Sequence, residues 1–90
     1  MQEIASHTIK IQKKLMTKDL LEIHTFAIHR DINIFLYHQE AMADARDLPK
    51  LLSFFMIDPH DEVLLIIEGN HAEQVYPKLI PLFSESKQIA

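Results

Sequence analysis

The sequence predicts one small α+β domain in which helices cover a single face of an antiparallel or mixed sheet. Segments with the two-residue period of strands alternate along the chain with segments whose apolar residues recur at helical spacing. At 90 residues, 48% of them hydrophobic, the chain is long enough for one modest core and too short for two. We therefore expect a single domain over residues 1–90, in the order strand, helix, strand, strand, short helix, strand, helix.

The first half of the chain contains four of these elements. Isoleucines alternate with polar residues over His7–Gln12, which predicts the first strand. Thr17 is placed to cap a helix over about 18–29, where apolar residues recur every three or four positions. Renewed alternation over 31–37 predicts a second strand, and a third, short strand is expected over 41–45.

The second half of the chain begins with a signal for the N-terminus of a helix at Asp47. Asp47 is a good N-cap and Pro49 is tolerated in a first turn, so we expect a short helix over about 48–54. The apolar run 63–67 then predicts a buried strand, bounded by Gly69, the only glycine in the chain.

The final predicted element is a helix that continues to Phe83, with Asn70 as its cap. Pro77 and Pro81 each remove a backbone hydrogen bond, at a cost of about 3 kcal/mol inside a helix. We therefore expect this helix to be kinked or split into shorter turns.

Composition and charge exclude several functional classes. The net charge of −4 disfavours a nucleic-acid partner, because such binding depends on clustered lysine and arginine, and the group Lys10, Lys13, Lys14 and Lys18 is too small. The chain has no cysteine, no secretion signal at its start and no apolar run near the roughly 18 residues of a membrane helix. We expect a cytoplasmic protein that binds neither nucleic acid nor membrane.

Six histidines raise the question of a metal site. No pair has the i, i+4 spacing of a two-histidine helical site, and His24 and His29, five apart, would diverge on a helix. We expect scattered surface histidines, no metal and no cofactor.

Two short segments resemble the phosphocarrier protein HPr family, which includes the regulatory paralogue Crh. Leu15–Asp19 lies where the family has an apolar residue, the phosphorylated histidine, a small residue, arginine and proline. Ala45–Leu48 lies at the family's separation from it, where a Lys-Ser pair and an apolar residue open the second helix, and Glu68–Gly69 falls at the end of the fourth strand. The resemblance extends over nearly the whole chain and implies an open-faced βαββαβα sandwich.

The departures from the family fall at its chemistry. Met16 replaces the histidine, and a thioether cannot form a phosphoramidate. Lys18 keeps a cation without the bidentate fork of arginine, and Asp19 brings a charge that repels a phosphoryl group. The sequence therefore predicts a non-enzymatic, HPr-like module rather than a phosphocarrier; a residual phosphocarrier that uses another histidine, such as His24, is the alternative.

Asp47 stands where some family members carry a regulatory serine. It is either a partial mimic of phosphoserine or only a helix cap, and capping alone explains it. In the family the surface beside the active centre and along the short helix docks partner proteins. The resemblance thus implies docking of a cytoplasmic protein, a transcription regulator or a metabolic enzyme, with these candidate contacts: Met16, Lys18, Asp47, Leu48, Pro49 and Leu52.

A second candidate interface lies on the outer sheet face. If one set of alternating strand residues faces the helices, the other set faces outward, on the side that the family leaves open. Contiguous exposed apolar residues often mark an interface, so a homodimer is a further possibility. The outward residues expected to mediate self-association are Phe35, Tyr37, Leu64 and Ile66.

Overall fold

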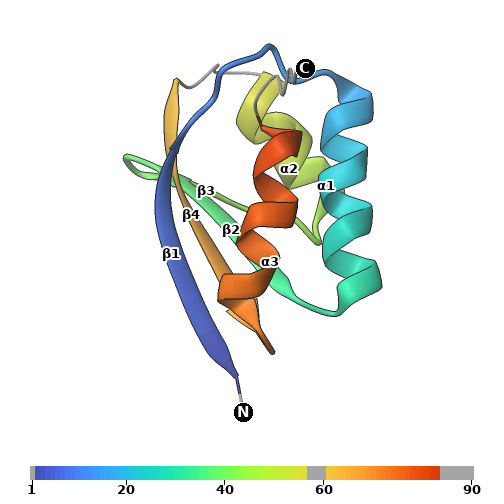
Figure 1. The fold of residues 1–90 in the computed structure, drawn as a ribbon. Helices are drawn as coiled ribbons and strands as arrows, with labels where there is room; N and C mark the ends of the chain where they lie inside the picture. Colours follow the sequence, from blue (N-terminus) through green and yellow to red (C-terminus); the bar gives the residue numbers. More distant parts are fainter. Residues whose placement is uncertain (1, 57–60, 84–90) are drawn as a thin grey trace, which may run out of the picture.

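The computed structural model describes residues 2–56 and 61–83, and its elements follow the predicted order (Figure 1). The elements are β1 (Glu3–Lys10), α1 (Thr17–Arg30), β2 (Asn33–His38), β3 (Ala41–Asp44), α2 (Leu48–Met56), β4 (Glu62–Gly69), α3 (Ala72–Leu79) and the 3-10 turn η1 (Ile80–Leu82).

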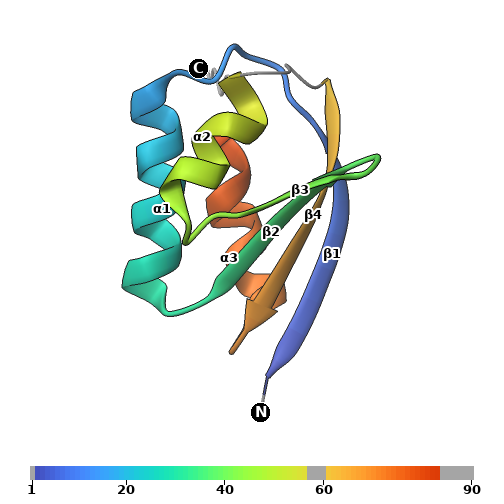
Figure 2. The ribbon, with the colours of Figure 1, turned by 180° about the vertical axis from the view of Figure 1, so that it is seen from behind.

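The four strands form one antiparallel sheet in the order β1-β4-β2-β3. β4, the last strand along the chain, lies between β1 and β2 and makes the central pairings. In Figures 1 and 2 the helices α1, α2 and α3 all lie on one side of the sheet, and no helix of residues 2–56 and 61–83 lies on the other side. The predicted α+β class and the open-faced sandwich are confirmed.

The core lies between the sheet and the helices. Ile34 and Leu36 of β2 and Leu65 of β4 are fully buried, as the alternation predicts. Leu20 and Ile23 of α1 are buried against them, so the helical stripe and the strand alternation meet in one apolar cluster.

Gly69 ends β4 where the backbone needs a residue without a side chain. It has a φ of +154°, and a Cβ at this position would lie 2.8 Å from Cγ2 of Ile32. Ile32 and the end of β4 approach each other this closely only because position 69 is glycine.

The strand boundaries differ from the prediction at β1 and β4. β1 runs from Glu3 rather than His7, and it pairs with β4 in register from Glu3 opposite Gly69 to Lys10 opposite Glu62. Pairing along the whole of β4 extends β1 into residues whose own pattern is only weakly that of a strand.

Two predicted helix caps are wrong. Met16, not Thr17, occupies the cap position of α1, and Thr17 is its first helical residue. His71, not Asn70, precedes α3, with a left-handed backbone at φ 61°. In α1 the Asp19 carboxylate reaches back from the first turn and accepts the backbone N–H of the cap residue Met16, and the carbonyl oxygen of Met16 accepts the N–H of Asp19.

The expectations for the other helices are confirmed. Asp47 caps α2: its carbonyl oxygen accepts the N–H of Leu51 at 3.0 Å and its Oδ1 accepts that of Lys50 at 3.4 Å. The last helix is split: α3 carries Pro77 and stops at Leu79, and the chain continues as the 3-10 turn η1.

Candidate functional site

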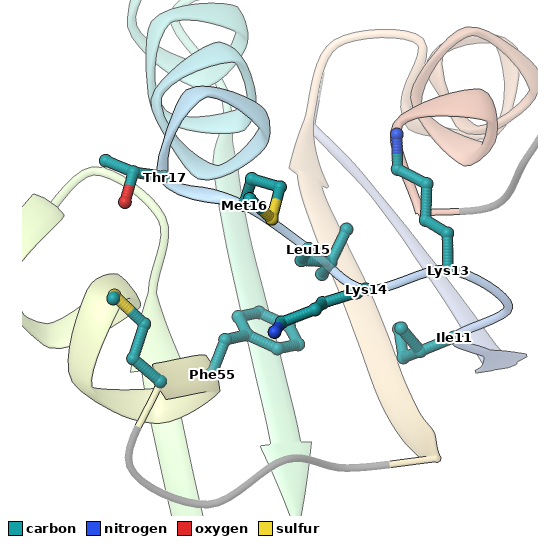
Figure 3. A pocket seen from close by; sticks show the side chains of 8 residues that line it. Ile11, Lys13, Lys14, Leu15, Met16, Thr17 and Phe55 are labelled. Carbon is teal, nitrogen blue, oxygen red and sulfur yellow. The ribbon is translucent and has the colours of Figure 1, made fainter.

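A pocket of about 510 Å³ lies where the turn between β1 and α1 meets the end of α2 (Figure 3). Most of its wall is apolar, and two lysines and one hydroxyl stand among the lining side chains. The eight lining residues are Ile11, Lys13, Lys14, Leu15, Met16, Thr17, Phe55 and Met56. The family resemblance places the phosphorylated histidine at Met16, so this pocket adjoins the corresponding position.

Met16 is exposed at the start of α1. It has extended backbone angles, φ −94° and ψ 168°, and its side chain is 52% exposed despite being large and apolar. The turn supplies Leu15 beside it, and α2 supplies Phe55 (Figure 3). An exposed thioether beside an apolar hollow is a contact surface that adapts to the shape of a partner.

The N-terminus of α1 is occupied by the chain's own carboxylate. Oδ2 of Asp19 accepts a hydrogen bond from the backbone N–H of Met16 at 2.8 Å, and Nζ of Lys13 lies 3.3 Å from Oδ1. Asp19 is only 6% exposed, so this arrangement is built into the packing of the turn.

These contacts lower the pKa of the Asp19 carboxyl below its ordinary 3.8. The hydrogen bond from the backbone of Met16 is the main cause, and Lys13 adds a hydrogen bond and a favourable charge. Burial acts in the opposite direction and is outweighed. Asp19 is therefore an anion at neutral pH, held at the helix end where negative charge is most stable.

The lysines around the pocket divide into two kinds. Lys13 and Lys14 both line the pocket, and Lys13 is also paired with Asp19. Lys18 is exposed in the first turn of α1 and is not among the lining residues. The pocket thus combines an apolar wall with a cationic rim. This composition suits an apolar side chain that is flanked by a carboxylate.

The structure divides the six predicted docking residues between the two ends of α2. Met16 lies by the pocket that includes Phe55 and Met56, the last two residues of the helix. Asp47 and Leu48 lie at its first turn, about 12 Å away along nine residues at 1.5 Å each.

The remaining candidates differ in exposure. Pro49 and Lys18 are exposed, while Leu48 and Leu52 are half-buried and pack against the core. None of Asp47, Leu48, Pro49 or Leu52 lines the pocket. These four residues remain a predicted contact surface along α2, separate from the pocket wall.

Sequence reasoning missed part of the pocket wall. Phe55 belongs to the core cluster at 9% exposure, but it also lines the pocket. Met56 is 59% exposed at the end of the apolar run that closes α2. The signal in the sequence was Met56 itself, a large apolar residue at the end of α2 that the core does not cover.

His7, His24 and His38 make local contacts. Nδ1 of His24 donates to the carbonyl oxygen of Ala45 at 2.8 Å, which ties α1 to the turn before α2. His7 stacks on Tyr76 with ring centroids 3.7 Å apart and lies 3.2 Å from Oε1 of Glu73. Within residues 2–56 and 61–83 no three potential ligands gather as a metal site would require, and His60 lies outside these ranges.

The outer sheet face carries the four residues predicted for it. Phe35 pairs with Ile66 and Tyr37 with Leu64 across β2 and β4, so the four side chains share the face opposite the helices. Leu64 is 36% exposed and the other three are half-buried. Met42 of β3, 49% exposed, extends this apolar strip toward the sheet edge.

The fold and the pocket together define an open-faced α+β sandwich with an apolar, lysine-rimmed hollow at the start of its first helix. Comparison of the chain with models of known protein families gives no match, and comparison with curated proteins gives no significant match. None of the helices in the described residues has the length and apolar character needed to cross a bilayer.

Proposed function

We propose that this chain is a non-catalytic, HPr-like regulatory module that binds another cytoplasmic protein through the pocket beside Met16. The observation that carries the proposal is an exposed Met16 at a helix start where the buried Asp19 carboxylate accepts the backbone N–H of Met16. The partner class that the resemblance implies is a transcription regulator or a metabolic enzyme, with a link to the sugar phosphotransferase system.

The geometry at this helix end argues against phosphotransfer. A phosphocarrier needs a nucleophile and an open helix N-terminus that receives the phosphoryl group. Here the nucleophile position holds a thioether, and the Asp19 carboxylate accepts the N–H of Met16. An incoming phosphoryl group would be repelled by this buried anion.

The same geometry supports docking. An apolar side chain of a partner that entered the pocket would be covered by Leu15, Met16 and Phe55, which is worth about 1.5–3 kcal/mol for one fully buried side chain. Lys14, on the pocket wall, would attract a carboxylate beside that side chain and steer the encounter. Binding of this kind needs no bond to be made or broken.

Affinity capture with matched variants tests the proposal. Met16→Glu places a charge in the pocket wall, and Met42→Glu is the control, because Met42 is equally exposed, 49% against 52%, on the opposite side of the sheet. We expect Met16→Glu to lose a protein that the wild type and Met42→Glu retain. Recovery of the same proteins by all three chains would refute the proposal.

A further inference from the structure

A second hollow, of about 390 Å³, lies between the C-terminal end of α1 and the N-terminal end of α3. It lies at the opposite end of α1 from the Met16 pocket, about 21 Å away along 14 residues at 1.5 Å each. Its lining residues are His29, Arg30, Ile32, Asn70, His71, Gln74, Val75 and Lys78.

The polar side chains of this hollow are all donors or cations. Arg30 and Lys78 carry positive charge, the two imidazoles each donate at least one N–H, and the two amides donate through their NH₂ groups. Among the described residues the lining includes no carboxylate, although the whole chain has 13 acidic and nine basic residues. This positively charged cluster is opposite in sign to the net charge of the chain, −4, and favours binding of an anion.

Asp31 and Glu73, the acidic residues next in sequence to the lining residues, each contact a partner outside the hollow. Oδ1 of Asp31, directly after α1, lies 3.4 Å from Nη1 of Arg46. Oε1 of Glu73, in the first turn of α3, lies 3.2 Å from Nε2 of His7 on β1. Each of these carboxylates therefore has a partner outside the hollow.

The backbone adds to the positive character. The first N–H groups bonded within α3 are those of Gln74 and Val75, both to the carbonyl of His71, and the His71 side chain makes no cap. This helix end keeps the positive pole of its dipole open. On the facing side the guanidinium of Arg30 lies 4.5 Å over the ring of Phe26, which holds it in place.

We propose that this hollow binds the phosphomonoester group of a small soluble metabolite. Arginine and lysine beside an open helix end form the donor set that recognises a phosphate dianion. The volume falls within the range of small-molecule sites, about 300–1,000 Å³, so it accommodates a short organic group as well as the phosphate. The proposal concerns binding alone and is independent of the Met16 pocket.

Titration of the ¹⁵N-labelled full chain with glycerol 3-phosphate, followed by NMR at constant ionic strength, tests this site. We expect saturable amide shifts at residues 29–30, 70–74 and 78, with none from glycerol. Lys78→Gln and Arg30→Gln should each weaken binding about tenfold or more. Lys50→Gln is the control, because Lys50 is an exposed cation on α2 outside this hollow.

Three outcomes would overturn the proposal. Shifts that follow ionic strength alone, or that Lys78→Gln and Lys50→Gln reduce equally, would mean nonspecific screening. Saturable shifts confined to the turn around Lys13 and Lys14 would place the anion elsewhere. Binding to vesicles that contain phosphatidic acid, without binding of glycerol 3-phosphate, would assign the headgroup to a membrane instead of a soluble metabolite. A retained amide spectrum confirms that each variant is folded.

Discussion

The carboxylate of Asp19 accepts a hydrogen bond from the backbone N–H of Met16 at 2.8 Å, which closes the first turn of α1 on itself. The same carboxylate forms an ion pair with Lys13 at 3.3 Å. One buried anion thus fixes the turn, the helix start and the position of the exposed Met16. The shape of the candidate docking pocket depends on this residue.

Replacing Asp19 with alanine should destabilise the fold. We expect a loss of about 1–2 kcal/mol in the free energy of unfolding, because the N–H of Met16 and the cation of Lys13 lose their partner. Urea denaturation at neutral pH measures it. Glu22→Ala, an exposed carboxylate one turn on, is the control and should change stability by less than about 0.5 kcal/mol.

The effect of Asp19 should depend on pH in a defined direction. Its folded-state pKa lies below the ordinary 3.8, so the folded chain holds fewer protons at this site than the unfolded chain. The stabilisation is complete above about pH 4 and is lost as the pH falls through the lowered pKa. The stabilities of the wild type and Asp19→Ala should therefore converge in acid, and a constant difference down to low pH would contradict the assignment.

Substitution of the buried Gly69 with alanine should be costly, although it adds only one methyl group. The new Cβ would lie 2.8 Å from Cγ2 of Ile32, in a backbone conformation that side chains rarely adopt. We expect about 1–3 kcal/mol of destabilisation by urea denaturation. Ser53→Ala, on the exposed side of α2, should stay within about 0.5 kcal/mol, and an equal effect of both variants would count against the close approach.

The chain should not accept phosphate from the family's phosphoenolpyruvate-dependent kinase. Met16 has no nucleophilic nitrogen, and Nδ1 of His24 is engaged with the carbonyl of Ala45. Intact-mass spectrometry after incubation should show no acid-labile addition. An acid-labile phosphate that disappears in His24→Gln would instead support the alternative of a residual phosphocarrier.

Self-association should depend on the outer sheet face. We expect sedimentation velocity to detect a concentration-dependent dimer that Leu64→Lys weakens, because the charge would interrupt the strip of Phe35, Tyr37 and Ile66. Leu21→Lys is the control, since Leu21 is 47% exposed on α1. A monomer at every concentration would remove this interface from consideration.

The fold was largely predictable because its local signals agree with one another. Alternation placed Ile34 and Leu36 inside and Phe35 and Tyr37 outside, and the sheet register confirms both sets. Prolines in the last helix predicted its division into α3 and η1. The alternation of apolar and polar residues did not predict the full length of β1, because that length is set by pairing with β4 over eight positions.

The candidate site was less predictable, because it joins residues far apart in the chain. The position of Met16 followed from the resemblance, but its neighbour Met56 is 40 residues away and is brought there by the packing of α2. The cap was missed for a similar reason: a threonine before a helix is the usual capping signal, whereas Asp19 reaches back from the first turn. Contacts of this kind depend on where a side chain points, which spacing alone does not fix.

Photo-crosslinking tests the central claim most directly. The chain carrying Met16→p-benzoylphenylalanine, irradiated in cells, should form a specific adduct with a second protein, since residue 16 is exposed beside the pocket. The chain carrying Met42→p-benzoylphenylalanine, on the opposite sheet face, should not form that adduct. An adduct from residue 42 with none from residue 16 would contradict docking at the Met16 pocket.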